Sequence, residues 1–126
     1  MTDAGAITIL IVDDHPVVRA GLRLLLSRAR ERFTIVGEAS SGAEAVALAR
    51  RLLPDVVLMD YAMPGLDGAQ ATRELRRQVP SSRVVLLVTF ETEAEIARGL
   101  AAGAAGVVAK DVAPSDLVGL VRRAAR

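Results

Sequence analysis

The chain has 126 residues, enough for one domain with a core of its own but not comfortably for two. Hydrophobic residues make up 52% of the chain and aromatic residues only 2%, so the core must be built from aliphatic side chains. A formal net charge of +1 argues against the basic excess that nucleic-acid binding needs, and the absence of cysteine excludes disulfides, thiol nucleophiles and thiolate metal sites.

The N-terminus carries no basic stretch of the kind that begins a signal peptide, and the apolar runs are too short to span a bilayer. We therefore predict a cytoplasmic protein with no membrane contact. Residues 1–6 are expected to be disordered, and residues 7–126 to form one domain.

Short β-branched runs alternate along the chain with longer amphipathic segments. The runs that predict strands are, in chain order, 7–12, 33–39, 56–60, 84–88 and 106–109. A helix is predicted after each strand, beginning at Pro16, Ser41, Asp67 or Gly68, Thr92, and Pro114 with Ser115. Proline suits a first helical turn, where its missing N–H costs nothing, and both Ser41 and Thr92 have a glutamate three residues later, the capping-box pattern. Five strand–helix units in succession imply a parallel sheet with helices on both faces.

Polar residues follow four of the predicted strands: Asp13 and Asp14, then Asp60, Thr89 and Lys110. The C-terminal ends of parallel strands share one edge of the sheet, so these side chains are expected to converge. Crowded carboxylates raise each other's pKa unless a cation joins them, and oxygen ligands suit Mg²⁺ or Mn²⁺. A lysine opposite supplies a point charge for phosphate oxygens.

Three stretches of the sequence, residues 12–22 (VDDHPVVRAGL), 59–68 (MDYAMPGLDG) and 103–111 (GAAGVVAKD), resemble the response-regulator receiver family. The first of them is similar to the NarL/FixJ (LuxR-type) class of two-component transcriptional regulators. The resemblance implies a flavodoxin-like (βα)5 three-layer sandwich, an α/β fold with parallel strand order 2-1-3-4-5.

The resemblance also implies a role for each residue at the sheet edge. Asp60 is expected to accept a phosphoryl group from a sensor histidine kinase, and Lys110 to contact the phosphoryl oxygens. Asp14 and Asp60 would bind Mg²⁺ (or Mn²⁺) directly, together with the backbone carbonyl of Ala62. Asp13 would act through a metal-bound water. Such a domain is a phosphoacceptor rather than an enzyme with an external substrate.

Partners follow from the same resemblance. A sensor histidine kinase is expected, and a homodimer is compatible with the family. Regulators of the NarL/FixJ class usually carry a DNA-binding domain after the receiver. DNA contact is therefore expected only through a domain beyond residue 126 of a longer parent protein.

The sequence departs from the family where the phosphate is read. The family's usual spacing, counted back from Lys110, places its phosphoryl-contacting hydroxyl at Val88, with Thr89 one residue later. Adjacent strand residues point to opposite faces, so Thr89 takes that role only if a bulge re-aims it. The family's switch aromatic falls on Val107. Phe90 and Glu91 are bulky neighbours that could restrict access.

Three functions remain open from the sequence. The first is a phosphorylatable receiver that controls transcription. The second, motivated by Val88 and Val107, is an atypical receiver that works as a phosphorylation-independent dimerisation or ligand-binding module. The third, a Mg²⁺-dependent phosphohydrolase, is disfavoured because Ala62 stands where a general acid would follow Asp60. His15 either lies at the edge of the site or only begins the helix.

Overall fold

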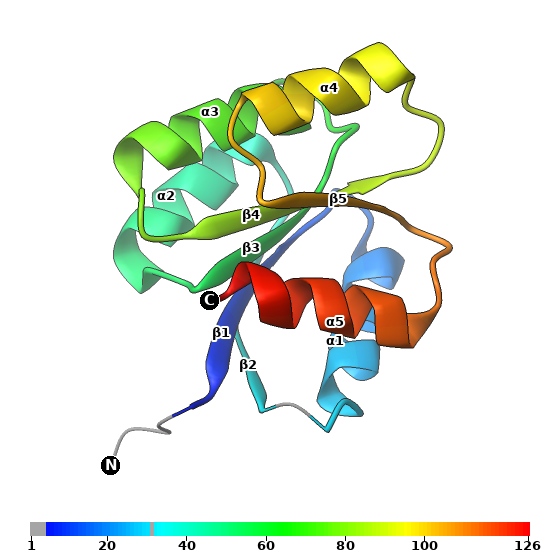
Figure 1. Cartoon of the computed structure of the whole chain (residues 1–126). Coiled ribbons are helices and arrows are strands. Elements are labelled where there is room, and N and C mark those ends of the chain that lie inside the picture. Colours follow the sequence, from blue (N-terminus) through cyan, green and yellow to red (C-terminus); the bar gives the residue numbers. More distant parts are fainter. Residues whose placement is uncertain (1–4, 31) are drawn as a thin grey trace.

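The computed structural model describes residues 5–30 and 32–126, in which strands and helices alternate along the whole chain (Figure 1). The strands are β1 (Ile7–Val12), β2 (Phe33–Ala39), β3 (Val56–Asp60), β4 (Arg83–Val88) and β5 (Gly106–Ala109). The helices are α1 (Pro16–Ser27), α2 (Gly42–Leu52), α3 (Gly68–Gln78), α4 (Glu93–Ala101) and α5 (Pro114–Ala124). All ten predicted elements are present, and β4 begins one residue earlier than predicted. Of the predicted disordered segment 1–6, residues 1–4 lie outside the described residues.

The strands form one parallel sheet in the order β2-β1-β3-β4-β5, which confirms the flavodoxin-like fold. Helices α1 and α5 cover one face of the sheet, and α2, α3 and α4 cover the other (Figure 1). The central strands β1, β3 and β4 are largely buried on both faces because their residues alternate between two clusters of mainly aliphatic side chains, whereas the edge strands β2 and β5 are only partly buried. Val84, Leu86 and Val88 of β4 face α2–α4, whereas Val85 and Leu87 face α1 and α5.

Side chains cap the first turns of α2, α3 and α4, the helices that follow the C-terminal ends of β2, β3 and β4. Thr92 and Glu95 form the predicted capping box at the start of α4, and Asp67 forms another with Gln70 at the start of α3. The predicted box at α2 is only half formed: Ser41 accepts the backbone N–H of Glu44, but the Glu44 carboxylate binds the backbone N–H of Ser40 instead.

No helix in the described part of the chain is both long enough and apolar enough to cross a membrane.

Candidate functional site

Three carboxylates meet where β1 and β3 end, as the shared edge of a parallel sheet predicts. Asp13 is fully buried, Asp60 is almost fully buried, and Asp14 is partly exposed. Asp13, Asp14, Asp60 and His15 each offer a ligand atom, and these four atoms lie within 4.8 Å of one another. The apolar strands that carry the aspartates deliver charged groups to a place from which water is largely excluded.

Lys110 joins the two most buried carboxylates. Its Nζ lies 2.9 Å from Oδ2 of Asp13 and 3.3 Å from Oδ2 of Asp60, and its side chain is 21% exposed. The backbone N–H of Lys110 donates to the carbonyl of Val88, so the pairing of β5 with β4 continues up to the lysine. This continuation fixes where the side chain begins and directs it across the edge of the sheet.

The pKa values of the two buried aspartates shift in opposite directions. Burial raises the pKa of Asp60, and the negative charge of Asp13 adds to this, against the opposing effect of Lys110. Burial also acts to raise the pKa of Asp13, but hydrogen bonds from Lys110 and His15 outweigh it, so the pKa of Asp13 is lowered. Burial acts to lower the pKa of Lys110, but its contacts with Asp13 and Asp60 raise it overall. Asp60 is therefore the more basic of the two carboxylates.

His15 lies at the edge of this site and also begins α1. Its Nδ1 is 3.0 Å from Oδ1 of Asp13 and 3.0 Å from Oδ1 of Asp14, and its backbone N–H donates to Asp13. The ring is largely exposed. The two interpretations of His15 left open by the sequence thus hold together, because the residue precedes the helix and contacts the acidic pair.

The donor set fits a hard divalent cation. Oδ1 of Asp14 is buried and accepts no hydrogen bond from the residues that the structure describes, although the His15 ring lies nearby. A buried carboxylate oxygen without a donor is costly unless a cation completes its environment. Asp13, Asp14 and Asp60 supply the oxygen ligands that Mg²⁺ and Mn²⁺ prefer. Ala62, whose carbonyl the resemblance adds to this set, is exposed in the loop after β3.

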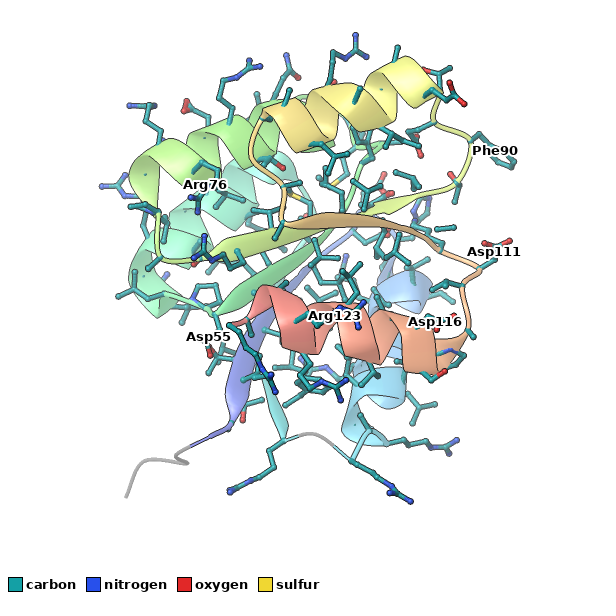
Figure 2. All side chains as sticks on the ribbon, viewed as in Figure 1. Asp55, Arg76, Phe90, Asp111, Asp116 and Arg123 are labelled. Carbon is teal, nitrogen blue, oxygen red and sulfur yellow. The ribbon has the colours of Figure 1, made fainter. Side chains whose placement is uncertain are left out.

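The end of β4 presents no hydroxyl from within the strand. Val88 is the last residue of β4, is buried, and pairs with Ala109 in a register that runs unbroken from Val85. Thr89 is exposed, and its backbone N–H donates to Oε1 of Glu91 at 2.8 Å. Phe90 is 97% exposed and projects from the loop between β4 and α4 (Figure 2).

Val88, Thr89, Phe90, Lys110 and Asp111 line a cavity of about 240 Å³ beside the carboxylates. The two bulky neighbours of the site thus do different things. Phe90 points into solvent, while Glu91 turns back onto the strand end.

An aromatic side chain does lie between the site and α4, but it comes from the loop after β3. Tyr61 is 2% exposed and belongs to the same cluster as Val88, against which Val107 packs. A Cβ built on Gly68 of α3 would lie 3.2 Å from the Tyr61 ring, and one on Gly99 of α4 would lie 3.5 Å from it. Gly68 therefore makes room for Tyr61, and α4 packs against the same ring at Gly99. The sequence analysis did not single out Tyr61, although its place directly after Asp60 was a usable signal.

Arg19 is a second residue that the sequence analysis missed. Helical periodicity places it only on the polar side of α1, yet its Nη1 donates to the backbone carbonyl of Asp13 at 2.6 Å. Its Nε donates to Oε1 of Glu38 at the end of β2. A basic residue one turn into a helix that follows an acidic loop can reach back to that loop, which was the available signal.

Comparisons with known proteins agree on one family. Residues 9–122 match the sequence family of the response regulator receiver domain. The chain is 39% identical over 120 residues to the uncharacterized transcriptional regulatory protein YxjL of Bacillus subtilis, covering 95% of this chain and 55% of that protein. It is 38% identical over 125 residues to the nitrate/nitrite response regulator protein NarL of Escherichia coli, covering 99% of this chain and 57% of that protein.

The solved structures give the same result. The receiver domain of the putative response regulator NarL from Mycobacterium tuberculosis superposes with a TM-score of 0.89 at 38% identity, covering 95% of this chain and 96% of that one. Our chain spans little more than half the length of the curated relatives, and it matches their receiver portion. The chain belongs to the response-regulator receiver family and is a receiver domain of the two-component type, similar to those of regulators of the NarL kind.

Proposed function

We propose that Asp60 is the phosphoacceptor of this receiver, taking a phosphoryl group from the phosphohistidine of a sensor kinase in a reaction that requires Mg²⁺ or Mn²⁺. The observation that carries the proposal is the single lysine contact with both buried carboxylates, 2.9 Å from Asp13 and 3.3 Å from Asp60. It puts a positive charge beside the more basic carboxylate, where a phosphoryl group would arrive.

The chemistry asks little of the protein beyond position and charge. An oxygen of Asp60 attacks phosphorus, the phosphorus–nitrogen bond of the phosphohistidine breaks as the phosphorus–oxygen bond forms, and the kinase imidazole leaves with the bonding electrons. Lys110 faces the phosphoryl oxygens and offsets their charge. Asp14 and Asp60 with the Ala62 carbonyl, and Asp13 through water, would hold a divalent cation, which would supply further charge neutralisation.

The expected output of this receiver is the regulation of transcription. The curated relatives are named as a transcriptional regulatory protein and a nitrate/nitrite response regulator, and this chain covers just over half of each. We infer that the receiver controls a DNA-binding domain of a longer, cytoplasmic regulator, so that DNA contact comes through that domain. A change in self-association of the receiver would be one way to pass the signal on.

The direct test is covalent phosphorylation. The purified chain is incubated with Mg²⁺ and acetyl phosphate, and its intact mass is measured. We expect the mass of one phosphoryl group to be added to the wild type, and no addition in Asp60→Ala or in the wild type with excess chelator. An unmodified wild type, or an addition that persists in Asp60→Ala, would rule out Asp60 as the acceptor.

A second candidate function rests on the other side of the site. Val88 and Val107 are aliphatic where the family uses a hydroxyl and an aromatic side chain, which supports a module that binds a partner without phosphorylation. Fluoroberyllate, a mimic of the phosphoryl group, separates the two candidates. If its addition changes the self-association measured by light scattering, the phosphorylation-independent module is excluded.

A further inference from the structure

We propose that Arg19 is a positioning residue for the metal-binding acidic pair: by holding the Asp13–Asp14 peptide, it sets the direction of the Asp14 carboxylate and thereby the affinity for Mg²⁺. This inference rests on the proposed function, because it assigns a role within the same metal-dependent site. Arg19 itself is not expected to touch either the metal or the phosphoryl group.

The loop after β1 is fastened to Arg19 at two points. The Arg19 backbone N–H donates to the carbonyl of His15, which opens α1, and Nη1 of the side chain donates to the carbonyl of Asp13 at 2.6 Å. The side chain is only 18% exposed, so this contact is made largely out of water. A hydrogen bond from a charged donor in such a place is stronger than one between neutral groups.

Glu38 fixes the guanidinium in the orientation that reaches Asp13. One of its oxygens accepts a hydrogen bond from Nε of Arg19 at 2.9 Å. The other accepts hydrogen bonds from Nε and Nη2 of Arg23 at 3.0 and 2.7 Å. Hydrogen bonds from Arg23 and Arg19 lower the pKa of Glu38, so it stays ionised and keeps both contacts at neutral pH. The neighbouring residue of β2, Ala39, accepts the backbone N–H of Asp13 at 3.0 Å.

The two aspartates differ in what holds their carboxylates. Both oxygens of the Asp13 carboxylate already have partners, since Oδ1 accepts from His15 and Oδ2 from Lys110. Oδ1 of Asp14 accepts no hydrogen bond from the described residues. Apart from the largely exposed His15 ring, whose Nδ1 lies 3.0 Å away, the direction of this carboxylate depends on the backbone that precedes it. The carbonyl of Asp13 belongs to the peptide plane that joins the two residues. Releasing that carbonyl frees the plane to rotate.

Arg23 provides a matched control because it shares Glu38 with Arg19, and among the described residues it makes no hydrogen bond or ion pair with the acidic loop. Arg19→Gln and Arg23→Gln each remove one partner of Glu38, and only the first removes the bond to Asp13. Arg19→Lys keeps the charge but cannot make both contacts, because an ammonium lacks the planar fork of a guanidinium.

The measurement is a Mg²⁺ titration followed by the fluorescence of Tyr61, which is the only tyrosine of the chain and follows Asp60 directly. Acetyl-phosphate labelling rates are measured in parallel as a function of Mg²⁺ concentration. For Arg19→Gln we expect an approximately tenfold loss of Mg²⁺ affinity, the lower end of what loss of an outer-shell partner costs. The Mg²⁺ concentration for half-maximal labelling rises equally, and the rate at saturating Mg²⁺ stays near that of the wild type.

Arg23→Gln should keep its Mg²⁺ affinity within about twofold of the wild type, and Arg19→Lys should fall with Arg19→Gln. Equal affinities in Arg19→Gln and Arg23→Gln would overturn the inference, as would a wild type that binds no Mg²⁺. Should Arg19→Gln fail to fold, Glu38→Gln must weaken Mg²⁺ binding in its place. A wild type that binds Mg²⁺ but is never phosphorylated would refute the proposed function and leave the role of Arg19 measurable.

Discussion

The two sides of the functional edge differ in how far their parts are fixed. On one side, the ends of β1, β3 and β5 bring Asp13, Asp60 and Lys110 into direct contact. On the other side, β4 ends in buried Val88, Thr89 is exposed, and Phe90 stands in solvent. Phosphoryl transfer and the conformational response to it therefore make separate demands on a receiver. The first needs charged groups at fixed distances, and the second needs a segment that can move.

Residue usage makes the first side easy to observe. The chain has one lysine, one tyrosine and one histidine, and these are Lys110, Tyr61 and His15, all at or beside the site. The signal of any of them in a spectrum therefore reports on this edge without further labelling.

The largest effect is expected from Lys110→Met, which removes the positive charge that contacts Asp13 and Asp60. It leaves buried Asp13 beside Asp60 without the cation that joins them. Breaking a fully buried pair costs 3–5 kcal/mol, and Lys110 is partly exposed, so we expect roughly 2 kcal/mol in unfolding free energy together with loss of acetyl-phosphate labelling. Urea denaturation without metal measures the first effect and intact mass the second.

Lys110→Arg serves as its control because it keeps the positive charge. Its stability should stay closer to the wild type than that of Lys110→Met. If both variants were as stable as the wild type, the ion pair would not be what organises this side of the site.

A second prediction concerns Gly68 of α3 and Gly99 of α4, which pack around Tyr61. A Cβ on Gly68 would lie 2.7 Å from the Tyr61 Cα, which is backbone, whereas a Cβ on Gly99 would lie 2.7 Å from the terminal Cδ1 of Leu86, which can turn away. We therefore expect Gly68→Ala to cost roughly 2 kcal/mol in unfolding free energy. Gly99→Ala should stay within about 1 kcal/mol of the wild type, because alanine also favours the helix.

Thermal and urea unfolding of the two glycine variants measure this difference. Equal losses would mean that the strand end and the helix yield alike, and that Tyr61 is not held against a rigid backbone.

Much of this molecule follows from its sequence. The continuous apolar run 84–88 and the turn signals after Asp60 predict buried strands, and a parallel sheet then forces Asp13, Asp60 and Lys110 together at one edge. Local rules also predict the Thr92 cap, whose partners are close in sequence. These features need only near neighbours and one topological rule, so a single sequence carries them.

What the sequence did not predict depends on side-chain direction across elements. Helical periodicity places Arg19 on the polar side of α1, but it does not show that this long side chain turns back to a carbonyl six residues earlier. The burial of Tyr61 needs Gly68, where a Cβ would lie 2.7 Å from the Tyr61 Cα, together with the packing of α4 against the ring, and this packing between elements is not a local signal. The half-formed cap at Ser41 has a local cause: the Glu44 carboxylate has two neighbouring backbone N–H groups within reach, and it binds that of Ser40.

A smaller effect is expected from Val88→Thr, which restores a hydroxyl at the end of β4. The valine is buried, so the hydroxyl should lower unfolding free energy by about 1 kcal/mol in the unmodified protein. With fluoroberyllate and Mg²⁺ the hydroxyl gains an acceptor, and the rise in melting temperature should exceed that of the wild type. A rise no larger than the wild-type rise would show that position 88 does not face the phosphoryl group.

The smallest effect, and the only one expected to stabilise, comes from Asp60→Asn without metal. Burial and the charge of Asp13 raise the pKa of Asp60 above its ordinary 3.8, so the folded state holds the Asp60 proton more tightly than the unfolded state. Ionisation of Asp60 thus lowers stability, fully above the raised pKa and not at all below 3.8. At pH 7 we expect Asp60→Asn to melt about 3–5 °C higher, equivalent to roughly 1 kcal/mol. The gain should shrink as the pH falls through that interval, and Mg²⁺ should stabilise the wild type more than the variant. A variant that melts below the wild type at pH 7 without metal would contradict this prediction. It would mean that Lys110 more than offsets the cost of burying the Asp60 charge, so that ionised Asp60 stabilises the fold before any cation binds.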